Sequence, residues 1–159
     1  MKRISGRMLL SLAALAICRP AWASHWFMTG AVDSGSGRQV GGVDRDSIVR
    51  QTEEGVRRAT FAYFSRSRRG TAKATGELDV DCPKLRFQQV RIVLEREDGQ
   101  RATILSRGPD WDEPRNPTDR ALLRAACTED FSALTDIRDA SPDGYAAARL
   151  AETGRKSRR

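Results

Sequence analysis

The chain has 159 residues, which is enough for one globular domain with a buried core and too few for two. Its 28 basic and 21 acidic residues give a net charge of +7, but eight of the basic residues lie in segments 1–23 and 155–159. The rest of the chain is close to neutral, whereas a nucleic-acid-binding domain carries its basic residues on the folded surface. The composition therefore argues against nucleic acid as a partner.

Residues 1–23 have the pattern of a cleaved secretory signal peptide. Basic residues at the start are followed by an apolar stretch at 8–17 and by Ala21-Trp22-Ala23, which has small residues where signal peptidase binds. The apolar stretch is too short for a membrane-spanning helix, which needs roughly 20 residues. We expect cleavage between Ala23 and Ser24, and export through the inner membrane to the periplasm, the cell surface or the medium.

A lipoprotein signal is the alternative to this interpretation, because Leu15-Ala16-Ile17-Cys18 resembles a lipobox. A lipobox prefers a small residue before its cysteine, and Ile17 is bulky and β-branched. The sequence therefore predicts cleavage without lipidation, and Cys18 leaves with the signal peptide.

Two cysteines, Cys82 and Cys127, remain in the exported chain. The oxidising space beyond the inner membrane favours disulfides in exported proteins. Cys82 stands at the end of a strand pattern, and Cys127 stands at the end of an apolar helical stripe. We therefore expect a disulfide between them that ties a helix to a strand of the sheet.

The segment from Ala72 to Cys82 alternates between apolar or small residues and polar residues. This period of two is typical of a β-strand with one face on a core and one in water. The segment 56–64 is apolar on both faces, which indicates a central or covered strand. Further strands are expected at residues 25–32, 39–48, 84–97 and after Gly99. The expected fold is α+β, with a single antiparallel β-sheet of about six strands and C-terminal helices, one tied to the sheet by the disulfide.

The segment 84–97 changes its periodicity near residues 88–89, which predicts a β-bulge that lets both apolar sets face inward. Asp98-Gly99 is typical of a two-residue hairpin turn. Such a turn predicts a register in which Leu94 lies opposite Thr103.

Two helices are expected after the strands. Asn116 and Ser141 are typical N-caps, and each is followed by a proline at the first helical position. The predicted organisation is a signal peptide, one domain at residues 24–137, and a C-terminal segment at 138–159 that contains a helix and a disordered basic tail.

Residues for catalysis are few. His25 is the only histidine, and a catalytic triad built on it would require a rigid mature N-terminus. Glu77, Asp79 and Asp81 lie along one polar strand face, where solvation is the usual role of carboxylates. The sequence therefore predicts a protein that is not an enzyme and needs no cofactor or metal. A small envelope hydrolase that uses paired carboxylates is the alternative.

The order of several features resembles the surface-adhesin protein E family of small exported bacterial proteins. The resemblance covers most of the mature chain. It rests on Trp26, Val43-Asp44-Arg45-Asp46-Ser47-Ile48, Asp81-Cys82, the hairpin at Gly99, Trp111 followed by Pro114, and Cys127. The chain differs from the family pattern because it lacks a good lipobox and continues past Cys127 with a helix and a basic tail.

The resemblance implies an antiparallel sheet with a C-terminal helix joined by the disulfide. It also implies relatives that bind haemin and host matrix proteins such as vitronectin and laminin. We therefore expect an exported, adhesin-like, non-enzymatic binding protein of the bacterial envelope. Its expected partner is an unidentified protein, envelope component or small ligand. A second copy of the chain, forming a homodimer, is a further candidate partner. Residues 155–159 would also make weak contact with anionic membranes.

Overall fold

The computed structural model describes residues 24–34, 37–67, 70–105, 110–138 and 140–152. The signal peptide and the basic tail that the sequence predicts lie outside this part of the chain. Ser24, the predicted first residue of the mature protein, is the first described residue. None of the helices in the described part is long and apolar enough to cross a membrane.

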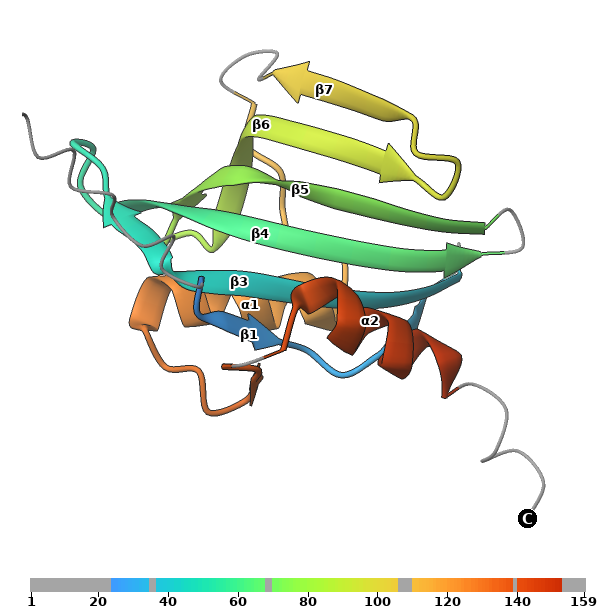
Figure 1. Ribbon diagram of the computed structural model, residues 1–159. Helices are drawn as coiled ribbons and strands as arrows, with labels where there is room; N and C mark the ends of the chain where they lie inside the picture. The colour runs from blue at the N-terminus through green and yellow to red at the C-terminus, as the bar shows by residue number, and fades with distance from the viewer. Residues whose placement is uncertain (1–23, 35–36, 68–69, 106–109, 139, 153–159) are drawn as a thin grey trace, which may run out of the picture.

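In the described residues, eight β-strands form one antiparallel sheet, and two α-helices lie in the C-terminal part (Figure 1). The strands are β1 (Trp26–Met28), β2 (Val32–Ser34), β3 (Gly37–Arg50), β4 (Val56–Ser67), β5 (Gly70–Asp81), β6 (Arg86–Arg96), β7 (Arg101–Leu105) and β8 (Thr135–Asp136). The helices are α1 (Pro117–Thr128) and α2 (Pro142–Ala151). The order across the sheet is β7-β6-β5-β4-β3-β1-β8, and β2 also pairs with β3. The predicted α+β class is therefore confirmed.

The sheet has more strands than the sequence predicts, for two local reasons. The strand expected at 25–32 is divided into β1 and β2, because the pairing of its two halves with β3 is offset by one residue. In the gap, the Thr29 hydroxyl accepts the N–H of Gly41 at 2.9 Å and replaces a backbone acceptor. The other addition, β8, has only two residues and is too short to show a period.

The central strand β4 is covered on both faces, as the segment 56–64 predicts. On one face, Ala59 and Phe61 pack in a buried core with α1. On the other face, Ala62 and Phe64 pack in a second core with α2. Figure 1 shows α1 behind the sheet and α2 in front of it. Helix α2, which belongs to the C-terminal segment predicted at 138–159, therefore packs on the same sheet as α1.

Strand β5 has the alternation that the sequence predicts. Leu78 and Val80 are 3% and 0% exposed and lie in the core on the α1 side. Asp79, between them, faces the other side and forms an ion pair with Arg58 of β4. Cys82 follows the strand directly and contacts the α1-side core, where the second cysteine of the predicted pair also lies.

The β-bulge expected in the 84–97 segment is present in β6. The register between β5 and β6 shifts between Glu77 and Leu78, and Val90 is the extra residue. Because of this shift, Phe87 and Ile92 both contact the α1-side core although their numbers differ in parity.

The predicted register of the β6–β7 hairpin is wrong by one residue. Leu94 lies opposite Ala102 rather than Thr103. The loop has three residues instead of two, and Gly99 at its end has a φ of +79°, a left-handed conformation that glycine adopts without strain. An Asp-Gly sequence suits both loop lengths, so the local sequence does not distinguish the two registers.

Both helices begin where the sequence predicts. The side chain of Asn116 accepts the N–H of Asp119 at 2.9 Å, and the hydroxyl of Ser141 accepts the N–H of Gly144 at 3.0 Å. A proline occupies the start of each helix. These contacts satisfy backbone donors that an uncapped helix would leave without a partner.

Candidate binding surface

The two helices leave the end of the sheet formed by β6 and β7 largely exposed. Both pack on β3 and β4, and α1 also reaches β5. Strands β6 and β7 extend beyond them, at the top of the view in Figure 1. Two large apolar side chains are exposed in these strands: Leu94 in β6 at 38% and Leu105 in β7 at 65%. This end of the sheet therefore combines paired strands with accessible apolar surface.

Strand β7 forms the edge of the sheet, and no other described strand pairs with its outer side. The N–H of Arg96 donates to the carbonyl of Gln100 at 3.0 Å, which fixes the phase of the β6–β7 hydrogen bonds. In an antiparallel pair the direction of the backbone groups alternates along each strand. Ala102 and Ile104 therefore bond inward to β6.

The N–H and C=O groups of the three remaining β7 residues point outward. These residues are Arg101, Thr103 and Leu105, and all of them are exposed. Natural sheets usually protect such an edge with charged residues, proline or a covering segment. Only Arg101 is charged here, and it is paired with Glu95 of β6. Within the described residues, the outward backbone groups of Thr103 and Leu105 thus have no strand partner, and no charge or proline between Ala102 and Leu105 would prevent pairing.

A cavity of about 330 Å³ lies between α2 and the loop ends of β4, β5 and β6. Its floor includes Phe64 and Leu150, and its rim is charged. Lys73 on the rim donates to both carboxylate oxygens of Asp143 at 2.8 Å. Another rim carboxylate, Glu97, accepts a backbone N–H from β5 at 3.0 Å. Lys73, Asp143 and Glu97 on the rim are therefore engaged with one another or with the backbone.

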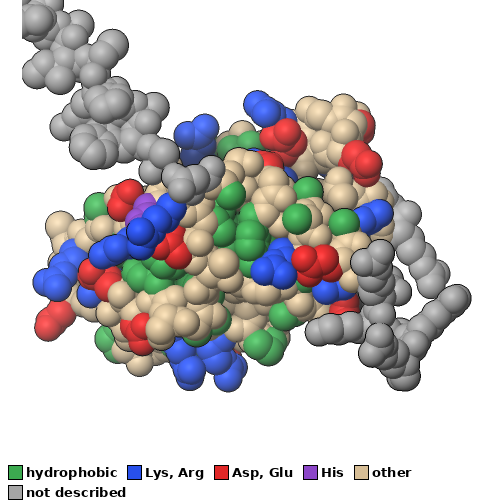
Figure 2. Space-filling model, turned by 60° about the horizontal axis from the view of Figure 1, so that its bottom comes forward, with side chains coloured by type: hydrophobic (Ala, Val, Ile, Leu, Met, Phe, Trp, Pro, Cys, Tyr) green, Lys and Arg blue, Asp and Glu red, His purple; other side chains and the backbone are tan. Residues whose placement is uncertain are grey.

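The single histidine holds the start of β1 to the far edge of the sheet. His25 Nε2 lies 2.8 Å from a carboxylate oxygen of Asp136 in β8, and its ring packs 4.7 Å from that of Phe27. Hydrogen bonds from Arg138 and then from His25 lower the pKa of Asp136. Figure 2 shows the histidine in purple among acidic and basic side chains. Its observed contacts thus join β1 to β8.

The carboxylates that the hydrolase alternative would use pair with arginines. Arg58 binds both oxygens of Asp79 at 2.8 Å, and Arg86 binds Asp81 at 2.7 Å. Glu77, the third carboxylate on this strand face, is exposed. Among the described residues, no cluster of three or more His, Cys, Asp or Glu side chains could bind a metal ion.

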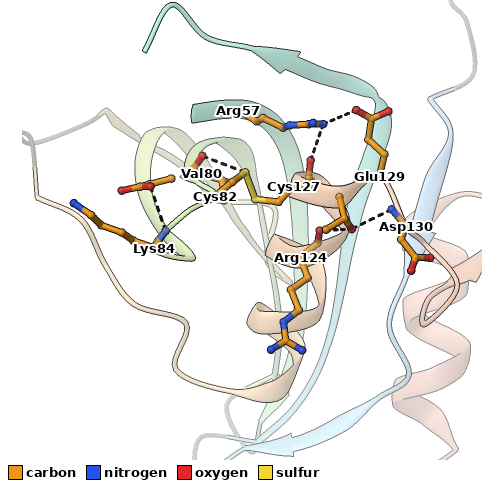
Figure 3. The surroundings of a disulfide bond; sticks show 11 residues. Arg57, Val80, Cys82, Lys84, Arg124, Cys127, Glu129 and Asp130 are labelled. Atoms are coloured by element: carbon orange, nitrogen blue, oxygen red, sulfur yellow. Dashed lines mark hydrogen bonds and ion pairs between the residues drawn. A yellow bond between two sulfur atoms is a disulfide. The ribbon is translucent and has the colours of Figure 1, made fainter. Parts of the chain in front are cut away.

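The predicted disulfide is present between Cys82 and Cys127, whose Cα atoms are 5.5 Å apart. It joins the turn after β5 to the last turn of α1 (Figure 3). Beside it, Arg57 donates to the carboxylate of Glu129 and to the carbonyl of Ala126, at 3.4 Å to the latter. Two independent links therefore hold the end of α1 against the sheet. A disulfide is compatible with export, which the sequence predicts on other grounds.

The sequence predicts the disulfide but not the exposed edge or the cavity. A weak signal for the edge was available, because the strand after Gly99 contains the uncharged run Ala-Thr-Ile-Leu. Whether such a run is covered depends on where the helices pack, and the sequence of neither helix indicates which strands it covers.

No protein-family model, no curated protein and no solved structure matches this chain. The resemblance to the surface-adhesin protein E family therefore stays a prediction.

Proposed function

We propose that the protein is an exported, non-enzymatic binding protein of the bacterial envelope that adds an extended segment of a protein partner to β7. The observation that carries the proposal is the outer edge of β7, with which no other described strand pairs and where three residues direct backbone groups away from the sheet. In recognition by strand addition, the backbone hydrogen bonds supply affinity and the side chains on alternate positions supply specificity.

The two faces of β7 offer different chemistry to such a partner. On the α1 side, Ala102 and Ile104 lie opposite Leu94 and Ile92, so an added strand would extend an apolar row. On the other side, Arg91, Val93 and Glu95 of β6 lie opposite Leu105, Thr103 and Arg101, a mixed row of charged, polar and apolar residues. A partner segment that alternates between apolar and polar residues would match both faces.

The rest of the domain suits this role because it holds the edge in place. Cores lie on both faces of β4, and the disulfide fixes α1 to the turn after β5. A preformed edge loses little conformational entropy when a segment binds. Host matrix proteins such as vitronectin and laminin are the partners that the resemblance suggests, and they serve as the first probes.

Replacing Thr103 by proline is the test of this proposal. Proline removes the outward N–H and clashes with a strand added at the edge, but it leaves the β6–β7 hydrogen bonds of Ala102 and Ile104 in place. Mature wild type, Thr103→Pro and Thr103→Ala would be compared for binding to immobilised vitronectin, laminin and an extract of the native envelope. A probe that binds wild type specifically should bind Thr103→Pro with an affinity at least about tenfold lower, which corresponds to a loss of about 1.4 kcal/mol in binding free energy. Thr103→Ala should bind as wild type does.

A second variant separates the edge from the cavity. Ala147 lines the cavity from the exposed side of α2, so Ala147→Trp would fill it without touching β7. Binding that survives Thr103→Pro and disappears with Ala147→Trp would place the ligand beside α2 and contradict the proposal. Melting temperatures of all variants within a few degrees of wild type would establish that each is folded.

A further inference from the structure

Asp44 is a buried carboxylate near the start of the mature chain. It lies in β3 opposite Trp26 of β1 and is only 7% exposed. In the described part of the chain, no lysine or arginine forms an ion pair with it. Burial raises the pKa of its carboxyl group, and the nearby negative charge of Asp46 acts in the same direction. Buried carboxylates are usually paired with a cation, because an unpaired buried charge is energetically unfavourable. Asp44 lacks such a cation among the described residues.

The residues that follow the predicted cleavage site lie beside Asp44. Trp26 is opposite Asp44 in the β1–β3 pairing, and the carbonyl of His25 accepts the N–H of Arg45 at 2.9 Å. Ser24, two residues before Trp26, therefore falls on the same side of the sheet as the Asp44 side chain. Hydrogen bonding by the hydroxyl of Ser24 and the backbone N–H of His25 lowers the pKa of Asp44 and partly offsets the effect of burial. A third donor, the N–H of Asp46, lies 3.1 Å from one carboxylate oxygen. Two of these three donors thus belong to the first two residues of the predicted mature protein.

We propose that cleavage after Ala23 creates the missing cation, and that the α-ammonium group of Ser24 then pairs with Asp44. Hydrolysis of the Ala23–Ser24 peptide bond consumes one water and leaves a carboxylate on Ala23 and an amine on Ser24. That amine is largely protonated at neutral pH, because an α-amino group has a pKa of about 7.7–8.0. Before cleavage the same nitrogen is an uncharged amide, so the pair forms only in the processed protein.

The geometry favours the pair because the β1–β3 pairing places Ser24 on the same side of the sheet as the Asp44 side chain. The α-nitrogen of Ser24 is bonded to the Cα that carries the Ser24 side chain. The next residue is held by its backbone carbonyl, which accepts the N–H of Arg45 at 2.9 Å, and by the 2.8 Å contact of His25 with Asp136. These two contacts of His25 already hold the start of the mature chain in place, so little conformational entropy is lost when the α-ammonium group pairs with Asp44. Most of the electrostatic attraction between the two groups therefore contributes to the stability of the folded protein.

The test combines two changes, one to the amine and one to the acid. Protein beginning at Ser24 would be prepared with a free and with an acetylated N-terminus, each as wild type and as Asp44→Asn. In wild type, acetylation should lower the melting temperature by about 3 °C or more, a shift equivalent to about 1 kcal/mol for a domain of this size. In Asp44→Asn, acetylation should change it by less than about 1 °C, because the acceptor charge is absent.

A third form keeps the test decisive if Asp44→Asn does not fold. Protein that retains Ala23 has a free amine displaced by one residue, so it should melt close to the acetylated form. Equal melting temperatures for the free, acetylated and Ala23-retaining forms would overturn the proposal. A mature protein from the native cell that begins at a lipidated Cys18, as measured by mass spectrometry, would also overturn it.

Discussion

Removing the Cys82–Cys127 disulfide is expected to lower the free energy of unfolding by about 4 kcal/mol. The bond closes a loop with a sequence separation of 45 residues, and a crosslink over that length restricts the unfolded chain by about this amount in the chain-entropy model. The double variant Cys82→Ala/Cys127→Ala should therefore melt more than about 10 °C below wild type under non-reducing conditions. Calorimetry or circular dichroism measures this difference.

Reductant provides the matched control for this prediction. It should lower the melting temperature of wild type towards that of the double variant and leave the double variant unchanged. The native secondary structure should persist at low temperature, because Arg57 still links the sheet to the end of α1. A wild-type melting temperature that does not respond to full reduction would contradict a stabilising role for the bond.

Replacing Gly76 by alanine is expected to destabilise the sheet by about 3 kcal/mol, since it forces a side chain into a closely packed site. Gly76 lies in β5 between Phe61 of β4 and Ile92 of β6, next to the β6 bulge. A Cβ atom at this position would collide with the backbone carbonyl of Arg91 and lie 2.8 Å from the Cα of Ile92. Because both are backbone atoms, they cannot move aside as a flexible side chain could. Chemical denaturation measures the loss.

The matched control is Gly30→Ala, because a Cβ atom at Gly30 would meet nothing within 4 Å. Its free energy of unfolding should stay within about 0.5 kcal/mol of wild type. Similar losses for the two variants would show that the effect belongs to any glycine replacement and not to the close approach of β5 and β6.

Features with strong local signals could be predicted from the sequence. The alternation from Ala72 to Cys82 predicted β5 and the position of the first cysteine, because burial of one face imposes a period of two. The caps at Asn116 and Ser141 predicted both helix starts, since a cap depends only on neighbouring residues. The apolar character of both faces of segment 56–64 predicted a covered central strand, and the cores on its two sides confirm it.

Features that depend on distant packing could not be predicted in the same way. The predicted hairpin register was wrong because Asp98-Gly99 fits loops of two lengths, and only the pairing of β6 with β7 determines which length forms. β8 exists because residues 135–136 meet β1 across the sheet edge, which no local pattern indicates. The exposure of β7 is a consequence of where both helices pack, and the placement of Ser24 on the same side of the sheet as Asp44 depends on the β1–β3 pairing.

Hydrogen exchange at the individual amides of β7 tests the proposed binding edge most directly. In the free protein, the outward amides of Thr103 and Leu105 should exchange rapidly, whereas those of Ala102 and Ile104 should be protected by their bonds to β6. After addition of a protein that binds wild type but not Thr103→Pro, the amides of Thr103 and Leu105 should become protected by at least about tenfold. Protection that appears only around the cavity beside α2, with Thr103 and Leu105 still exchanging rapidly, would contradict binding by strand addition.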